Sequence, residues 1–373
     1  MIKKIGITGQ RGFVGSHLYN TLGLLPKEFE RVEFHNSYFD SPDELQKFVS
    51  TCDIIVHLAA MNRSEDPQLI YNTNITLVKN LIQALEHTKA VPHVLFSSSS
   101  QEDNDNPYGK SKQEGRALFE DWAKKNNALF TGMVIPNVFG AFGKPYYNSF
   151  IATFCHQLTH GETPEVHNDS EVKLIYVQEL VEEIINKINT ASTIERYAVP
   201  HTATKKVSAV LASLKAFKTC YFDRGEIPEL KDAFDINLFN TYRSFIDYNN
   251  FFPAYFKQHV DPRGSFVEVI RLGVGGQVSF STTVPGITRG NHYHTRKIER
   301  FAVIKGKALI QLRRIGTNEV LDFYLDGDKP SYVDMPIWYT HNIKNIGNEV
   351  LYTNFWINEF YNPDDADTYF ENV

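Results

Sequence analysis

The chain has 373 residues, of which 42% are hydrophobic and 22% are charged, and 38 basic against 44 acidic residues give a net charge of -6. This length exceeds the usual single domain core and leaves room for two, while so mild a charge gives no sign of a nucleic-acid or membrane-surface partner. Three cysteines without CxxC spacing, at positions 52, 155 and 220, suit a reducing cytoplasm. The first residues resemble a strand entering a glycine loop rather than a signal sequence, and no apolar run approaches the ~20 residues that span a bilayer. We therefore expect a cytoplasmic protein.

Up to about residue 140, apolar β-like runs alternate with helical patterns. The expected strands cover residues 2–8, 53–60, 93–100 and 132–140, and the expected helices cover 16–25, 76–88 and 110–127. Because these strands are mostly apolar, both faces of their sheet should be covered by helices. The pattern predicts an α/β doubly wound (Rossmann) domain with a parallel sheet.

A glycine-rich loop, TGQRGFVG, joins the first expected strand to the first expected helix. Glycines at this spacing permit a tight turn, let the backbone approach a pyrophosphate and let the helix pack on the strand. The helix N-terminus then presents N–H donors to the phosphates. We expect the loop to bind a nicotinamide dinucleotide through Gly9, Arg11, Gly12, Phe13, Val14 and Gly15.

The choice between NADH and NADPH depends on the residue that follows the second strand. NAD enzymes place an acid there to bind the ribose 2′-hydroxyl, but here the expected position falls near His35 or Asn36. Arg11 could pair with a 2′-phosphate through a charge-assisted contact, although it could also be an ordinary solvated loop charge. The sequence favours NADPH.

Tyr108 and Lys112, in NPYGKSK, are four residues apart at the start of an expected helix, and this spacing puts them on one face. A phenol can act as a general acid/base if a nearby ammonium lowers its pKa from ~10 towards neutrality. Lys112 could do this while holding the nicotinamide ribose. The run FSSSSQ upstream provides a hydroxyl for the reacting oxygen, so these residues predict a hydride-transfer site.

Together with Asp53 and the HLAA stretch, these motifs resemble the extended short-chain dehydrogenase/reductase family. The resemblance implies that Asp53 lies near the adenine and that Ser99 is the catalytic hydroxyl, with Ser98 as the alternative. It also implies that four residues lie against the cofactor: His57, Leu58, Ala59 and Ala60.

Sugar-nucleotide dehydratases of this family carry an Asp-Glu pair beside the catalytic hydroxyl. In this chain Ser100 and Gln101 follow Ser99, and Glu102 comes only after them. The sequence therefore favours reduction or epimerisation over dehydration.

From about Asp247 the chain changes to short alternating runs separated by turn signals such as TNE and DGDKP. Such a pattern is typical of an antiparallel barrel or sandwich. We place the domain boundary at this change, which gives a first domain of residues 1–247 and a second, all-β domain of residues 248–373.

The second domain contains a histidine motif, GITRGNHYHTRKIERFAVIKG. Two histidines separated by one residue face the same side of a strand, and a carboxylate with a third histidine would complete a set suited to zinc or another divalent metal. The motif is similar to that of the cupin barrel, and the resemblance implies four metal ligands: His292, His294, Glu299 and His341. It points to zinc, while manganese, iron and nickel stay open. Trp338 departs from the cupin pattern, which usually has glycine there.

Across its whole length the chain resembles the bifunctional epimerase/reductases of bacterial capsular polysaccharide synthesis. The stretches that carry this resemblance are NPYGKSK, YNSFIATFC, PGITRGNHYH and DTYF. It implies that the cupin domain epimerises C3 of a UDP-4-keto-6-deoxy-HexNAc. The first domain would then reduce the C4 ketone with NADPH to UDP-2-acetamido-2,6-dideoxy-L-talose, in a homodimer.

Two points stay open at this stage. The epimerisation base is not identified, although Tyr293, Tyr339 and Lys297 lie near the metal motif. The alternatives are a ketoreductase whose cupin serves only dimerisation and zinc-dependent structure, and a non-enzymatic redox or sugar sensor.

Overall fold

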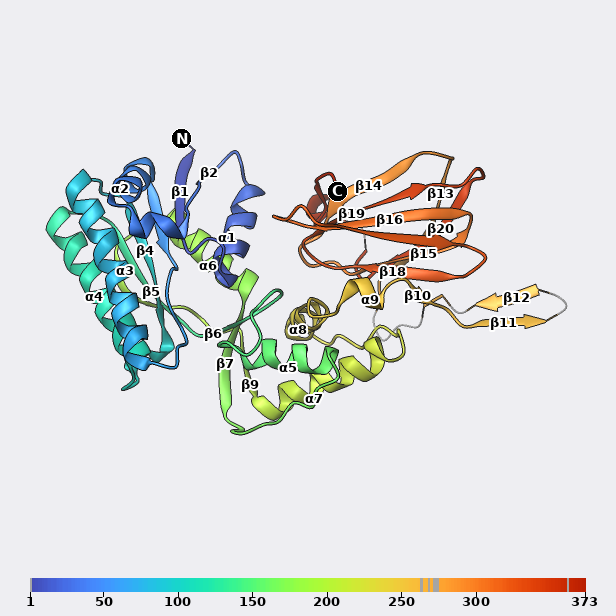
Figure 1. Cartoon of the computed structure of the whole chain (residues 1–373), viewed down its shortest axis with the longest axis horizontal. Coiled ribbons are helices and arrows are strands. Elements are labelled where there is room, and N and C mark those ends of the chain that lie inside the picture. Colours follow the sequence, from blue (N-terminus) through green and yellow to red (C-terminus); the bar gives the residue numbers. More distant parts are fainter. Residues whose placement is uncertain (1, 262–263, 268, 271–274, 361) are drawn as a thin grey trace. The chain divides into compact units, whose positions relative to one another are not determined.

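The computed structural model describes residues 2–261, 264–267, 269–270, 275–360 and 362–373. It divides into two compact units, each of which is formed from two stretches of chain (Figure 1). Unit 1 comprises Met1–Thr153 and Val166–Ser208, and unit 2 comprises Phe154–Glu165 and Ala209–Val373. Among the described residues, no helix is both long enough and apolar enough to cross a membrane.

Unit 1 is built on a six-stranded sheet in the order β2-β1-β3-β4-β5-β8, and all its strand pairs are parallel. Its strands are β1 (Lys3–Thr8), β2 (Phe29–Val32), β3 (Ile54–His57), β4 (His93–Ser99), β5 (Phe130–Ile135) and β8 (Ile194–Ala198). The predicted doubly wound parallel sheet is confirmed.

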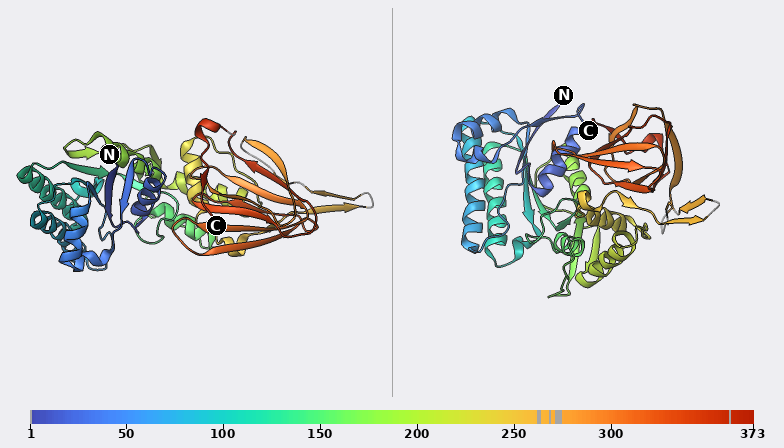
Figure 2. Two further views of the ribbon diagram at one scale, coloured as in Figure 1. Left: turned by 90° about the horizontal axis from the view of Figure 1, so that it is seen from above. Right: turned by 45° about the vertical axis from the view of Figure 1, so that its right-hand side comes forward.

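Helices cover both faces of this sheet, as its apolar strands require (Figures 1 and 2). One core layer lies under α1 (Phe13–Gly23) and α6 (Val177–Thr190). The other lies under α2 (Pro42–Thr51), α3 (Pro67–Thr88) and α4 (Pro107–Asn126). A smaller sheet of β6 (Asn137–Phe139), β7 (Glu171–Tyr176) and β9 (Ala203–Lys206) completes the unit.

Unit 2 contains two five-stranded antiparallel sheets, β10-β18-β15-β20-β13 and β17-β16-β19-β14-β21. The strands of the first are β10 (Ala254–Tyr255), β13 (Gln277–Thr283), β15 (Glu299–Lys305), β18 (Ser331–Met335) and β20 (Leu351–Ile357). Those of the second are β14 (Thr288–Tyr293), β16 (Lys307–Arg314), β17 (Val320–Asp326), β19 (Tyr339–Asn345) and β21 (Tyr369–Phe370). A separate ribbon pairs β11 (Gln258–Asp261) with β12 (Gly264–Val267). The predicted all-β C-terminal architecture is confirmed, and it is consistent with a cupin barrel.

Helices from the middle of the chain belong to unit 2 as well. They include the end of α5 (Phe150–Thr159), most of α7 (Val207–Phe217), the π-helical turn η3 (Lys218–Phe222), α8 (Ala233–Arg243) and α9 (Tyr248–Phe251). They are tied to the barrel by buried polar contacts. Arg243 donates to the carbonyl of Met335 at 3.0 Å, and the Tyr221 hydroxyl donates to Asp334, which pairs with Arg300. The compact units therefore do not divide the chain at residues 247 and 248. The domain boundary that we placed there stays a prediction.

Candidate active site and metal centre

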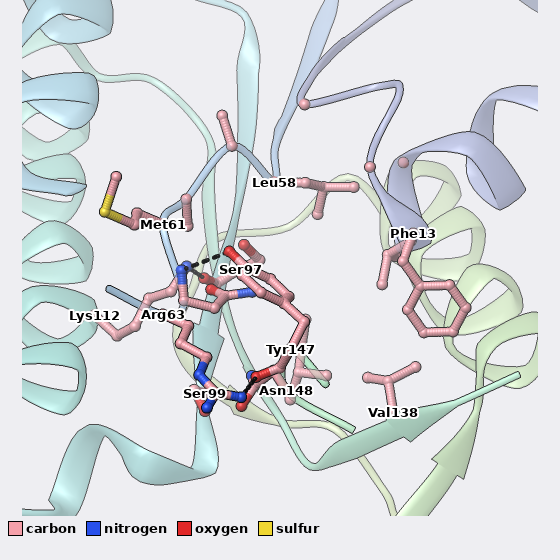
Figure 3. Close-up of a pocket in the computed structure, with 18 of the residues that line it drawn as sticks. Phe13, Leu58, Met61, Arg63, Ser97, Ser99, Lys112, Val138, Tyr147 and Asn148 are labelled. Carbon is pink, nitrogen blue, oxygen red and sulfur yellow. Dashed lines mark hydrogen bonds between the residues drawn. The ribbon is translucent and has the colours of Figure 1, made fainter. Parts of the chain in front are cut away.

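Unit 1 has a cavity of about 900 Å³ at the carboxyl ends of its parallel strands (Figure 3), which is where ligands bind in open α/β sheets. The glycine loop forms part of the wall. The turns after β3 and β4, the start of α4 and the segment after β5 also contribute to the wall.

The glycine loop has the geometry that the sequence predicted. The backbone of Gly9 is left-handed, with a φ of +74°, and its carbonyl accepts a hydrogen bond from the N–H of Gly12 at 2.9 Å. A Cβ atom on Gly15 would lie 2.2 Å from the Gly9 oxygen, so the helix can approach the turn this closely only without a side chain. All six loop residues predicted to bind the cofactor line the cavity: Gly9, Arg11, Gly12, Phe13, Val14 and Gly15.

The stretch after β3 divides between cavity and core. Leu58, Ala59 and Ala60 line the cavity, but His57 does not. Its ring is buried, and Nδ1 lies 2.8 Å from the Thr8 hydroxyl. Burial, and then the charge of Lys112, lowers the pKa of His57 to about 3, so the ring is a neutral part of the protein interior. His57 thus packs against Phe96 and Phe119 in the protein interior, and its ring does not line the cavity, contrary to the prediction.

The prediction for Asp53 is wrong. Asp53 is exposed and immediately precedes β3, at the amino end of the parallel strands. Its carboxylate accepts a hydrogen bond from the backbone N–H of Lys4 at 2.8 Å. Since the cavity lies at the carboxyl ends, this carboxylate is at the opposite edge of the sheet.

The segment after β2 presents an amide to the cavity. Glu33 follows the strand and lies 3.2 Å from the ring of His35, but neither residue lines the cavity, whereas Asn36 does. Phe39 and Asp40, from the 3-10 helix η1 (Asn36–Asp40), also line it. The sequence reasoning missed them, because no spacing rule places this turn against the glycine loop.

The predicted catalytic residues meet in the same cavity. Lys112 is buried, and its ammonium donates to the carbonyl of Ser97 at 2.8 Å and lies 5.8 Å from the centre of the Tyr108 ring. The side chain of Ser99 lies close enough to Tyr108 to act on the pKa of its phenol. Ser98, the alternative hydroxyl, instead donates to the carboxylate of Glu102, so the geometry favours Ser99.

The pKa values of this group differ from the expectation. Burial raises the pKa of Tyr108 to about 12, although the Ser99 side chain opposes the rise. Burial lowers the pKa of Lys112 to about 8. The lowering of the Tyr108 pKa that we expected from Lys112 is absent, and removal of water from the phenol is the largest cause of the shift. A protonated phenol beside the cofactor loop suits proton donation, which a ketone reduction requires.

Glu102, the first carboxylate after the serine run, does not face the cavity. It is buried, and it accepts hydrogen bonds from Ser98, Arg116 and Arg196. Ser100 and Gln101 line the cavity in its place. An acid of the dehydratase type is therefore missing from this position, in agreement with the sequence.

The far wall of the cavity contains residues that the sequence reasoning missed. The hydroxyl of Tyr147 accepts a hydrogen bond from the backbone N–H of Asn62 at 3.2 Å. Arg63 donates to the carbonyls of Tyr146 and Tyr147 (Figure 3). Tyr147 also raises the pKa of Tyr108 electrostatically, so the two phenols are neighbours. Only tertiary packing brings these residues together.

The four predicted metal ligands converge in unit 2. One ligand atom from each of His292, His294, Glu299 and His341 lies within 4.8 Å of all the others. Oε2 of Glu299 lies 3.0 Å from Nε2 of His294 and 3.2 Å from Nε2 of His341. These three buried atoms have no hydrogen-bond partner of acceptable geometry.

The chemistry of these atoms fits a cation. Nδ1 of His294 lies 2.5 Å from the carbonyl oxygen of Asp367, and because a carbonyl can only accept, Nδ1 carries the proton. Although burial opposes it, the Glu299 carboxylate raises the pKa of His294, so the site favours positive charge between the ring nitrogen and the carboxylate. Burial lowers the pKa of His292 to about 4, which leaves that ring neutral. Three imidazoles and a carboxylate form a set that binds zinc and other divalent ions.

Trp338, the departure from the cupin pattern, keeps the backbone geometry that favours glycine. Its φ is +61°, its N–H donates to the carbonyl of His294 at 2.8 Å, and its ring stacks on Tyr293. Of the candidate bases, Tyr293 therefore faces away from the two histidines beside it, and the ammonium of Lys297 donates to the carbonyl of Ala366. The epimerisation base stays open.

Comparison with known families assigns both parts of the chain. The profile of the NAD dependent epimerase/dehydratase family matches residues 5–198. That of the polysaccharide biosynthesis C-terminal domain matches residues 259–369.

Individual relatives extend over nearly the whole chain. UDP-2-acetamido-2,6-beta-L-arabino-hexul-4-ose reductase of Pseudomonas aeruginosa is 31% identical, over 98% of each chain. The crystal structure of the capsular polysaccharide assembling protein CapF from Staphylococcus aureus has 35% identity and a TM-score of 0.64, covering 99% of this chain and 100% of that one. RMD from Pseudomonas aeruginosa, solved with NADPH, has 21% identity and a TM-score of 0.54 over 58% of this chain and 82% of its own, which shows the fold alone.

Proposed function

Because this chain belongs to the NAD dependent epimerase/dehydratase family and also carries a polysaccharide biosynthesis C-terminal domain, we propose that it is a bifunctional nucleotide-sugar enzyme of capsule synthesis. The barrel epimerises C3 of a UDP-4-keto-6-deoxy-HexNAc, and unit 1 reduces the C4 ketone with NADPH. The product is UDP-2-acetamido-2,6-dideoxy-L-talose. The observation that carries the proposal is that a Ser-Tyr-Lys site and a three-histidine carboxylate site occur in one chain.

The reductase half is supported by a relative and by the cavity. The Pseudomonas relative is named as a reductase of a UDP-linked hexul-4-ose, a sugar with a ketone at C4. NADPH would supply a hydride to that carbon. Ser99 holds the C4 oxygen, and Tyr108 donates its phenolic proton to it as the alkoxide forms. Lys112 orients the nicotinamide ribose.

The preference for NADPH is supported by two residues on the cavity wall. Asn36 faces the cavity where an acid would bind the 2′-hydroxyl of NADH. Arg11, which is exposed on the glycine loop, lines the same cavity and would pair with a 2′-phosphate.

The epimerase half is supported by the acidity of the substrate and by the convergent ligands. A ketone at C4 acidifies the hydrogen on C3, so a base and a means of stabilising the enolate suffice for inversion. A zinc or other divalent ion held by His292, His294, Glu299 and His341 would supply Lewis-acid stabilisation of that charge. Reduction of the ketone then removes the acidity of C3 and fixes its configuration, which is a chemical reason to link the two activities. The homodimer and the cytoplasmic location rest on the sequence resemblance and on the cysteine pattern.

The test is NADPH oxidation with a freshly generated UDP-4-keto-6-deoxy-HexNAc, with and without a chelator, and with the product stereochemistry determined by NMR. We expect a C3-inverted product only when metal is present. An uninverted product under both conditions would leave a ketoreductase with a structural barrel. No oxidation with any keto-sugar nucleotide would remove the enzymatic proposal altogether.

A further inference from the structure

Residues 362–373, which we call the strap, run along the edge of the barrel beside the metal ligands. Part of the strap, β21, pairs with β14 in antiparallel register, and this pairing puts His292 opposite Phe370. Asp367 is buried although its neighbours in the strap are largely exposed. The β21–β14 pairing and the burial of Asp367 therefore attach the strap to the barrel.

Asp367 makes two kinds of contact with the ligand-bearing segment. Its carbonyl accepts the Nδ1 proton of His294 at 2.5 Å. Its carboxylate accepts hydrogen bonds from the backbone N–H groups of Thr295, Arg296 and Lys297 at 3.0, 3.0 and 3.1 Å, and from the Thr295 hydroxyl at 2.6 Å. One residue thus fixes the ring of His294 and the turn that connects it to Glu299.

Other strap residues contact the surroundings of the remaining ligands. The N–H of Glu371 donates to the carbonyl of Asn291, the residue before His292. The carbonyl of Glu371 accepts a hydrogen bond from Thr340, the residue before His341. Each ligand, or its immediate segment, is therefore in contact with the strap.

We propose that Asp367 is a positioning residue of the metal centre, and that the strap sets the affinity of the centre for a divalent ion. A metal-bound histidine needs a partner for its second nitrogen, because that partner fixes the tautomer and the orientation of the ring. Asp367 provides this partner, and its four carboxylate contacts hold the partner in place. The inference rests on the proposed metal centre and is independent of the epimerase activity.

The test measures zinc affinity in the full-length protein by competition with a chromophoric chelator, without any sugar. Asp367→Ala removes the four carboxylate contacts and frees the strap beside His294, so zinc affinity should fall by about 10–100-fold. The cobalt(II)-loaded variant should show shifted absorption bands, because the geometry of the ligands changes, which a purely structural loss elsewhere would not cause.

Asp365→Ala is the matched control. Asp365 lies in the same strap and pairs with Arg296 at 2.9 Å, but it is exposed and touches neither His294 nor the backbone of the turn. Its loss should leave zinc affinity within about twofold of the wild type, as expected for an exposed ion pair.

If Asp367→Ala does not fold, Thr295→Val provides a milder variant, since it removes one of the four carboxylate contacts and should weaken zinc binding several-fold. Wild-type zinc affinity in a folded Asp367→Ala or in Thr295→Val would overturn the inference. A wild type that binds no divalent ion would remove the metal centre and the inference together. A wild type that binds zinc but inverts no C3 would remove only the epimerase proposal.

Discussion

Tyr108 has the environment of a proton donor, since it is half-buried, close to Ser99 and held above its ordinary pKa by desolvation. Tyr108→Phe removes the proton but keeps the ring, so ketone reduction should slow by about 10²–10⁴-fold, the usual contribution of general acid catalysis. Single-turnover oxidation of NADPH measures the effect. Binding of NADPH, followed by its fluorescence, should stay unchanged; a parallel loss of binding would show that the phenol has a structural role.

Lys112 should determine the pH dependence of the reductase. Burial lowers its pKa to about 8, whereas Tyr108 stays protonated until about pH 12. The ammonium is present below pH 8 and is lost above it, so kcat/KM for reduction should be flat below about pH 8 and fall above it. In Lys112→Met, kcat/KM should be low at every pH, and its pH profile should lack the fall above about pH 8. An unchanged alkaline limb in that variant would assign the titration to another group.

Asn36 provides a direct test of cofactor choice. Asn36→Asp introduces a carboxylate on the cavity wall where the proposed 2′-phosphate lies, and like charges in a cavity repel. The ratio of kcat/KM for NADPH to that for NADH should fall roughly tenfold or more, which corresponds to about 1.4 kcal/mol. Glu33→Gln, at a residue that does not line the cavity, is the control. Because that variant removes a negative charge, a general charge effect would raise the ratio in it by a comparable factor, whereas an effect confined to the cavity would leave the ratio unchanged.

At the residue scale, the sequence located the groups whose spacing is local. The three glycines, Tyr108 and Lys112 could be predicted because a turn or a single helical face determines their positions. Asp53 could not, because its role depends on which end of a strand carries the cavity, and a residue before β3 lies at the wrong end. Tyr147 could not, because a loop distant in sequence folds back to meet Asn62.

At the element scale, β4, η2 (Ser100–Asp103), α4 and β8 are joined by the buried carboxylate of Glu102, which pairs with Arg116 from α4 and Arg196 from β8. Glu102→Gln leaves two guanidinium groups without a full counter-charge, so the free energy of unfolding should fall by about 3 kcal/mol. Urea denaturation measures this. Asp103→Asn removes only an exposed partner of Arg196 and should cost less than about 1 kcal/mol.

The position of Glu102 in this network also predicts that it does not contact the substrate. The residues that line the cavity there are Ser100 and Gln101, and the acid next to them is used to hold elements together. The KM of Glu102→Gln for the keto sugar should therefore stay near the wild-type value although stability falls. A large rise in KM without a loss of stability would mean that the carboxylate faces the substrate.

The periodicity of apolar residues could predict the strands and helices, because burial on one face or on both faces of a segment fixes where its apolar residues occur. It could not predict that the helices between residues 209 and 247 pack with the barrel, since their contacts run to Met335 and Asp334, far along the chain. The strap has only one short strand and no repeating apolar pattern, so its role at the metal ligands is visible only in the folded structure.

At the scale of the whole molecule, the two proposed activities depend on different residues in different compact units, and so they should be separable. Tyr108→Phe should stop reduction but leave metal-dependent exchange of the C3 hydrogen for deuterium, because that exchange needs only the barrel. Glu299→Gln should do the reverse, because it weakens the metal centre without touching the cavity of unit 1. In D₂O, NMR of the keto sugar measures exchange, and absorbance of NADPH measures reduction. Loss of both activities in either single variant would mean that one site serves both steps.

Mixing the two variants should restore the C3-inverted alcohol, since a released keto sugar can pass from one protein to the other. Failure of the mixture, with each half-activity intact, would show that the intermediate is not released between the two steps.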